Sequence, residues 1–219
     1  MTAASRRTLL RFGLIADLQY ANIDDGFNFD KTKKRYYRNA ISLLRTAMKD
    51  WKHHNIRFVL QLGDIIDGFC RRVEEPETCL NRILDIFGEE SWPLFNVIGN
   101  HELYNFKKDK LYTSRLFNTL QRTNKAYHST ELFPGLKLCA LNTYDISILG
   151  AVEGTSEYDK AHNYLLQNPN IDKNDPSGLI STQRRLAGFN GGVSEEQQEW
   201  LKKELASAVQ QQQNVIVIG

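Results

Sequence analysis

Hydrophobic runs of strand length recur three times in the first half of the chain, and each one ends in a polar loop. Residues 9–16 are apolar apart from Arg11, and mainly apolar runs also occupy residues 57–62 and 94–98. Runs of this length and character are typical of strands that are covered on both faces. The pattern therefore predicts three buried strands.

Between these strands, apolar residues recur at spacings of three and four, which indicates amphipathic helices. We expect one helix over residues 31–54 and a second over residues 77–87, which Gly88 ends. The alternation of strands and helices predicts a parallel sheet with right-handed crossovers, and ligands collect beyond the carboxyl ends of such strands. The apolar stripe of the first helix consists of Tyr37, Ile41, Leu44, Met48 and Trp51.

The second half of the chain has a less regular pattern. A helix is predicted over residues 111–120 and a strand over residues 136–141, but the periodicity is lost from residue 145 to residue 192. Loops of this length are usually functional or mobile. We expect a short helix within this one, around residues 158–167.

The last part of the chain is predicted as a helix followed by a strand. Ser194 and Gln197 have the spacing of a capping box, so the helix is expected to begin at Ser194. Residues 214–218 then form a final apolar run of strand length.

Composition and charge narrow the class of protein. The 219 residues suit one sizeable domain, taken as residues 1–219, and 41% of them are hydrophobic. A net charge of +2 gives no indication of binding to nucleic acid or to an anionic membrane. No apolar run is long enough to span a bilayer, and Asp17 interrupts the one that could begin a signal peptide. Three scattered cysteines favour a reducing, cytoplasmic setting.

Polar side chains of one chemical kind follow each of the three predicted strands. The segments are D-x-Q at 17–19, G-D-x-x-D at 63–67 and G-N-H-E at 99–102. Carboxylate and amide oxygens are hard ligands, which suit Mg²⁺, Mn²⁺ or a catalytic pair of zinc or iron ions. A carboxylate at the tip of the central strand can bridge two ions about 3.5–4 Å apart. Each motif alone is common, but three in this order predict one metal-centred site.

In this order and spacing, DLQ, GDIID and GNHE resemble the calcineurin-like metallophosphoesterase superfamily. Its pattern begins D-x-H, so Gln19 is a departure. With that glutamine, the segments RYYRNA, GNHELYNF, YDISILG and FNGGVSEEQQEWL resemble the manganese-dependent ADP-ribose/CDP-alcohol diphosphatase family within it. The resemblance covers nearly the whole chain and implies an α/β fold, a four-layer αββα sandwich.

The resemblance also implies the ligands of two divalent ions. Asp17 and Gln19 would bind the first ion, Asp64 would bridge both, and Asn100 would bind the second. Mn²⁺ is the expected metal, with Zn²⁺, Fe and Mg²⁺ as alternatives. An oxygen donor at Gln19 in place of a histidine nitrogen fits a harder ion such as Mn²⁺.

Other residues have roles beside the metal. By the resemblance, His101 would be the catalytic histidine, which either protonates the leaving group or stabilises the phosphoryl oxygens. Asp67 is expected to accept hydrogen bonds that hold the loop rather than to bind an ion. Phe29 and Tyr104 are aromatic residues close to the metal loops, and we expect them to contact the substrate.

The implied activity is hydrolysis of a pyrophosphate bond by a monomer that takes small nucleoside diphosphate derivatives. ADP-ribose, its cyclic relatives and CDP-alcohols such as CDP-choline are all candidate substrates. A phosphomonoesterase or nuclease is a further possibility, but near-neutral charge argues against long nucleic acids. The alternative from another class is a non-catalytic scaffold that binds proteins, and the retained candidate ligands argue against it.

The basic residues of the segment 31–35 have two interpretations. Lys31, Lys33, Lys34 and Arg35 stand where a helix start is expected, against the usual preference of the helix dipole. Their side chains either form a solvated face or attract an anionic ligand. Elsewhere, His128 and His162 have no acidic or cysteine neighbour at ligand spacing, so both are predicted to lie on the surface.

A stacking role for Phe29 follows from its place beside the first metal loop. The Phe29→Ala variant is expected to raise the Michaelis constant for ADP-ribose, because a nucleotide base needs a surface to stack on. Steady-state kinetics measure this constant. An unchanged value would remove Phe29 from the site.

The superfamily pattern continues with a lone histidine after a later strand and then G-H-x-H, and neither occurs in residues 1–219. We therefore expect a domain that is incomplete at its C-terminus, with later strands of the second sheet missing and an edge prone to aggregation. Purified residues 1–219 should show weak or absent manganese-dependent turnover of ADP-ribose. Robust turnover in the same assay would refute this expectation.

Overall fold

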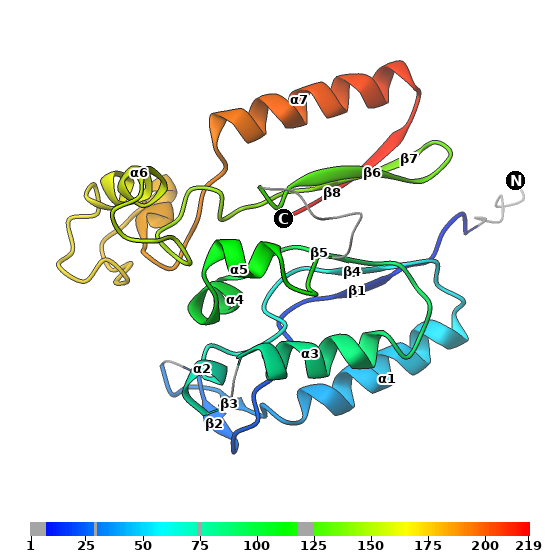
Figure 1. The fold of residues 1–219 in the computed structure, drawn as a ribbon, viewed down its shortest axis with the longest axis horizontal. Coiled ribbons are helices and arrows are strands. Elements are labelled where there is room, and N and C mark those ends of the chain that lie inside the picture. Colours follow the sequence, from blue (N-terminus) through cyan, green and yellow to red (C-terminus); the bar gives the residue numbers. More distant parts are fainter. Residues whose placement is uncertain (1–7, 29, 74–75, 118–124) are drawn as a thin grey trace, which may run out of the picture.

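The molecule is built from two packed sheets with helices on both outer faces. The computed structural model describes residues 8–28, 30–73, 76–117 and 125–219. Figure 1 shows four layers in the order helices, sheet, sheet, helix. The two outer layers are α1 and α3 on one side and α7 on the other, with bounds Ala40–His53, Pro76–Phe87 and Glu195–Gln210. The expected αββα sandwich is therefore confirmed.

The first sheet consists of three parallel strands in the order β1-β4-β5. Leu14 pairs with Leu60, and Leu60 pairs with Phe95. The predicted parallel sheet with a helix between successive strands is thus confirmed, although each strand is shorter than its apolar run. All three strands run toward the end of the molecule where α4 lies (Figure 1). Their bounds are Gly13–Ile15, Val59–Gln61 and Leu94–Asn96.

The two faces of this sheet are buried in different ways. Val59 belongs to the core beneath α1 and α3, whereas Leu60 belongs to the core between the two sheets. Successive side chains on a strand point to opposite faces, so a nearly continuous apolar run fills both cores. The core between the sheets is made by Phe58, Leu60, Phe95, Val97, Leu138, Ala140 and Ile218.

The second sheet contains two predicted strands and one that the sequence did not reveal. β7 (Leu136–Ala140) and β8 (Asn214–Ile218) pair in parallel, as two predicted strands, and β6 (His128–Phe133) pairs antiparallel with β7. β6 was missed because it is largely polar. One of its polar side chains, Ser129, bonds through Oγ to Glu204 of α7 at 2.8 Å.

The prediction of a helix over residues 31–54 is wrong in its first part, because α1 begins at Ala40. A small antiparallel hairpin precedes it, made by β2 (Gly26–Phe27) and β3 (Lys34–Arg35). The side chain of Asn28 accepts the backbone N–H groups of Thr32 and Lys33, each at 2.9 Å. Such local bonds compete with a helix for the same donors.

The segment after β5 forms two short helices, α4 (Asn100–Asn105) and α5 (Lys108–Tyr112). The prediction of a helix over residues 111–120 is therefore wrong in position, since α5 ends at Tyr112 and its C-cap is Thr113. Residues 118–120 of that prediction lie outside the described residues. The other short helix is α2 (Cys70–Val73), which precedes the well-predicted α3.

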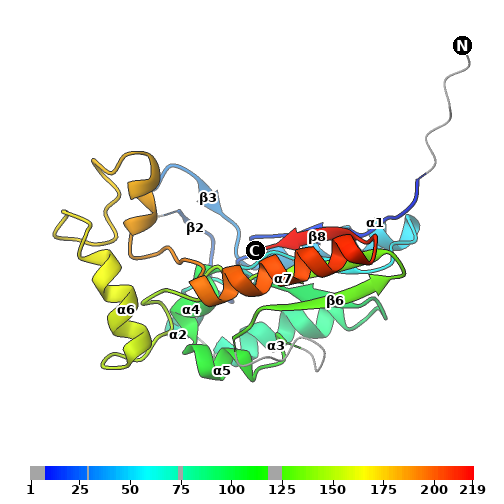
Figure 2. The ribbon, with the colours of Figure 1, turned by 90° about the horizontal axis from the view of Figure 1, so that it is seen from above.

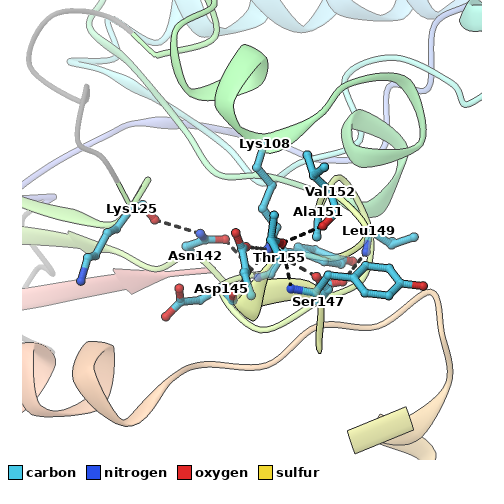
Figure 3. Close-up of polar contacts among 12 residues, drawn as sticks. Lys108, Lys125, Asn142, Asp145, Ser147, Leu149, Ala151, Val152 and Thr155 are labelled. Atoms are coloured by element: carbon cyan, nitrogen blue, oxygen red, sulfur yellow. Dashed lines mark hydrogen bonds and ion pairs between the residues drawn. The ribbon is translucent and has the colours of Figure 1, made fainter. Parts of the chain in front are cut away.

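The long segment after β7 has structure of its own. It contains α6 (Ser156–Leu165) and a 3₁₀ turn, η1 (Ser181–Leu186), and it lies at one end of the layers (Figures 1 and 2). The expected short helix is thus confirmed. Figure 3 shows Lys108 of α5 reaching into this segment. Its buried Nζ donates to the backbone oxygens of Asp145 (3.3 Å) and Ser147 (3.5 Å) and pairs with Glu157.

Half of the predicted capping box is present at α7. Ser194 is the N-cap, and its Oγ accepts the backbone N–H of Gln197 at 3.2 Å. The side chain of Gln197 does not return to Ser194 but bonds the backbone of Asn142, accepting its N–H at 2.9 Å and donating to its oxygen at 3.0 Å. The glutamine therefore ties α7 to the loop after β7.

Both histidines were predicted to lie on the surface; the prediction is wrong for His128 and confirmed for His162. His162 is exposed, but His128 is buried at the start of β6, and neither ring nitrogen has a hydrogen-bond partner among the described residues. Burial lowers the pKa of His128. The described cysteines are buried and form no disulfide among the described residues. No described helix is both long and apolar enough to cross a membrane.

Candidate metal centre and active site

The loops that follow β1 and β4 are joined by backbone hydrogen bonds. Asp17 N–H donates to Gly63 O at 3.2 Å, and Gln19 N–H donates to Asp64 O at 2.8 Å. The loop after β5 joins them through His101, whose N–H donates to Asp64 Oδ1 at 2.9 Å. The three polar loops expected from the sequence therefore meet at one end of the first sheet.

The side-chain amide of Gln19 contacts the carboxylates of both Asp17 and Asp64. Gln19 Nε2 lies 3.3 Å from Asp17 Oδ1 and 3.2 Å from Asp64 Oδ2. A 180° flip of the side-chain amide exchanges Nε2 and Oε1 of Gln19. It would place Oε1 beside the oxygens of Asp17 and Asp64. Three oxygen donors would then face a cation, so the donor set fits a hard divalent ion.

The backbone at this point is unusual. Asp17 (φ 54°), Gln19 (φ 44°) and Asp64 (φ 57°) all have left-handed conformations, which are uncommon outside glycine. Such outliers persist only where the surrounding structure holds them. Gly99 shows how closely the loops approach, because a Cβ there would lie 2.0 Å from Asp64 Oδ1.

The carboxylate of Glu102 holds these loops together, and the sequence analysis gave it no role. Glu102 is fully buried, and its oxygens accept the N–H groups of Asp64 (2.9 Å), Ile65 (2.7 Å) and Gly99 (2.8 Å). Burial and the nearby Asp64 charge raise the pKa of Glu102 to about 7, against the lowering effect of these N–H donors. The available signal was its place three residues after Gly99, where a helix N-terminus needs an acceptor.

Asp64 itself is buried and close to several charges. Burial is the largest cause that raises the pKa of its carboxyl group, and the Asp17 carboxylate raises it further. His101 and the Gln19 amide act in the opposite direction. Asp17 is exposed, so only Asp64 brings a buried carboxylate to this contact. Two carboxylates that approach one another are stabilised by a cation between them, which agrees with the donor geometry.

The ring of His101 is held through one nitrogen. Its Nδ1 accepts the N–H of Gly68 at 3.0 Å and lies 3.4 Å from Asp67 Oδ2. Burial lowers the pKa of His101, but the carboxylates of Asp67 and Asp64 outweigh it, so the pKa is raised overall. With Nδ1 engaged by the protein, Nε2 is the nitrogen that can donate a proton or a hydrogen bond to a substrate.

Asp67 makes the contacts expected of a residue that holds the loop. It is buried, and its Oδ1 accepts the N–H of Phe69 at 2.9 Å. Its Oδ2 lies 3.4 Å from Nδ1 of His101 and 3.7 Å from Arg35 Nη1. Asp67 thus links the hairpin β2–β3 to the histidine.

Asn100 and Tyr104 are coupled on α4. Asn100 Nδ2 donates to the hydroxyl of Tyr104 at 2.9 Å, and the Tyr104 ring centre lies 5.3 Å from that of His101. This bond occupies the amide nitrogen of Asn100 and leaves its Oδ1 to act as a ligand. Substrate contact by Tyr104 stays a prediction, and Phe29 lies outside the described residues.

The candidate centre depends on amides. Within residues 8–28, 30–73, 76–117 and 125–219, no group of three or more His, Cys, Asp or Glu side chains could hold an ion without other donors. Gln19 lies beside the carboxylates of Asp17 and Asp64 and is placed to add an oxygen donor, whereas the side chain of Asn100 bonds Tyr104.

Comparisons with known proteins point to one family. The model of the calcineurin-like phosphoesterase family matches residues 10–219. The chain is 40% identical to a manganese-dependent ADP-ribose/CDP-alcohol diphosphatase of Oryza sativa subsp. japonica, over 98% of this chain and 66% of that protein. It is 35% identical to the protein of the same name from Homo sapiens, over 98% of this chain and 67% of that protein.

A solved structure is similar as well. The crystal structure of a dimetal phosphatase from Danio rerio superposes with a TM-score of 0.89 at 36% sequence identity, covering 95% of this chain and 68% of that one. The chain therefore spans about two thirds of the length of the relatives it matches.

The Glu102→Gln variant tests whether the buried carboxylate holds the metal loops. Glutamine has the same shape but turns one acceptor into a donor that faces backbone N–H groups. We expect the free energy of unfolding, measured by urea denaturation, to fall by about 3 kcal/mol. The matched control is Glu153→Gln, since Glu153 is exposed. Equal unfolding free energies for the two variants would contradict the role of Glu102.

Proposed function

Because the chain belongs to the calcineurin-like phosphoesterase family, we propose that the protein that carries this site hydrolyses the pyrophosphate bond of nucleoside diphosphate derivatives. The substrates are ADP-ribose, which gives AMP and ribose 5-phosphate, and CDP-alcohols, of which CDP-choline gives CMP and phosphocholine. The names of the curated relatives support this substrate class. The similar structure from Danio rerio is that of a dimetal phosphatase, which supports a pair of metal ions.

Four side chains would hold the ions. Asp17 and Gln19 are proposed for the first ion, Asp64 for both and Asn100 for the second, and Mn²⁺ is the proposed metal. When bound, such a pair neutralises phosphoryl charge and lowers the pKa of a water molecule so that it can attack phosphorus. The tight contact among Asp17, Gln19 and Asp64 is the observation that carries the proposal.

The protein's own groups then position the reactants. His101 is fixed through Nδ1 by Gly68 and Asp67, so its Nε2 can donate to an oxygen of the phosphate that leaves or to a phosphoryl oxygen. The Glu102 carboxylate fixes the backbone of Asp64 and Gly99, which keeps the loops after β4 and β5 at a constant separation. Preorganised groups of this kind cost no rearrangement during the reaction.

Metal binding by residues 1–219 provides a direct test. Calorimetric titration with Mn²⁺ is expected to show binding that Asp64→Asn weakens at least about 10-fold, because even indirect ligand contacts are worth that much. Asp159→Asn is the matched control, since Asp159 is exposed on α6.

Metal binding by residues 1–219 and turnover by the whole protein that carries the site together separate an enzyme from a scaffold. Manganese-dependent release of AMP from ADP-ribose by the protein that carries the site would support the enzyme, and Asp64→Asn should abolish it. Absence of Mn²⁺ binding, or binding that Asp64→Asn leaves intact, would refute the proposal and favour a non-catalytic scaffold.

A further inference from the structure

The basic segment before α1 contains cations of two kinds. Lys34 Nζ lies 3.3 Å from Asp25, and Arg38 bonds Asn22 at 2.9 Å and Asp24 at 2.6 Å. These two cations are neutralised by acidic residues of the same region. The solvated-face interpretation of the segment 31–35 therefore holds for Lys34.

Arg35 differs from both. Its one ion pair among the described residues is with Asp67 Oδ2 at 3.7 Å, which is longer than a hydrogen bond. No described residue accepts a hydrogen bond from its guanidinium, and the side chain is 34% exposed. None of its nitrogens is among the buried polar atoms that lack a partner, so water reaches the guanidinium. An anion that enters the neighbouring site can take the place of this water and accept the hydrogen bonds.

The position of Arg35 indicates which anion. The Asp67 oxygen that lies 3.7 Å from Arg35 Nη1 also lies 3.4 Å from Nδ1 of His101, so the guanidinium and the imidazole contact the same carboxylate oxygen. The segment that carries Arg35 packs against the loop that contains Asp67. The ring centres of Tyr37 and Phe69, one from each segment, are 6.1 Å apart. Arg35 therefore borders the proposed active site and belongs to an element fixed against it.

We propose that Arg35 binds the second phosphate of the diphosphate substrate, the one that does not sit on the metal ions. This inference rests on the proposed function and deepens it, since it gives the enzyme a means to prefer diphosphates over monophosphates. A planar guanidinium matches two phosphate oxygens at once, which an ammonium group does not. The pair with Asp67 holds the guanidinium in place without using its donors for hydrogen bonds.

A binding experiment tests Arg35 without relying on turnover. The probes are α,β-methylene-ADP, which keeps two phosphates and resists hydrolysis, and AMP, which has one. Calorimetry with Mn²⁺ present should show that Arg35→Met weakens binding of α,β-methylene-ADP about 100-fold, while binding of AMP changes less than about two-fold. Arg35→Lys should recover only part of the loss.

The matched control is Arg38→Met, which removes a nearby arginine that is already paired with Asp24. It should leave the affinity for both probes unchanged. Unaltered Mn²⁺ binding by Arg35→Met would show that the metal loops remain folded in that variant.

Each other outcome overturns the inference in a recognisable way. Equal losses for both probes would mean that Arg35 acts only through Asp67 and the loop. No loss for either probe would mean that Arg35 does not meet a phosphate. If the unmodified protein binds neither probe, or both equally well, the diphosphate substrate itself is wrong and the inference falls with it.

Discussion

The structure of the site depends on one buried carboxylate. Glu102 is removed from solvent, yet it accepts N–H groups from two loops that follow different strands. A buried charge is tolerated only when its hydrogen bonds are satisfied. The two loops must therefore keep their N–H groups within hydrogen-bond distance of the carboxylate. The same bonds keep Asp64 in its left-handed conformation and within reach of Asp17 and Gln19.

The surrounding fold supplies the stiffness that this arrangement requires. Both faces of the first sheet are buried, one beneath α1 and α3 and the other against the second sheet. Parallel strands end at the same edge, so three short loops can share a site without long connections. Glycine at 63 and 99 lets the backbones of two of these loops touch, since a Cβ at Gly63 would lie 2.6 Å from Gly99 N.

Elements outside the first sheet and its covering helices also contact the candidate site or are fixed beside it. The β2–β3 hairpin brings Arg35 to Asp67, and Asp67 in turn meets His101. The segment after β7 is fixed to α5 through Lys108 and to α7 through Gln197. The proposed metal ligands and the proposed phosphate donor thus come from separate parts of the chain.

Local sequence patterns determined the elements whose partners are near in the chain. The three parallel strands, α3 and the N-cap at Ser194 follow from apolar runs, helical spacing and a side chain three residues from its donor. The candidate ligands could also be identified, because each follows a strand directly. The topology of a parallel sheet then brings them together without further information.

Tertiary structure alone decided the contacts between residues far apart in the chain. β6 is a strand although it is largely polar, because its polar side chains find a partner on α7. The segment before Ala40 became a hairpin because Asn28 captured backbone donors that a helix needs. Glu102 reaches Asp64 across 38 positions and Arg35 reaches Asp67 across the hairpin, and no periodicity encodes such pairs. The order of residues determines which groups can bind or donate, and the packed fold decides which of them meet.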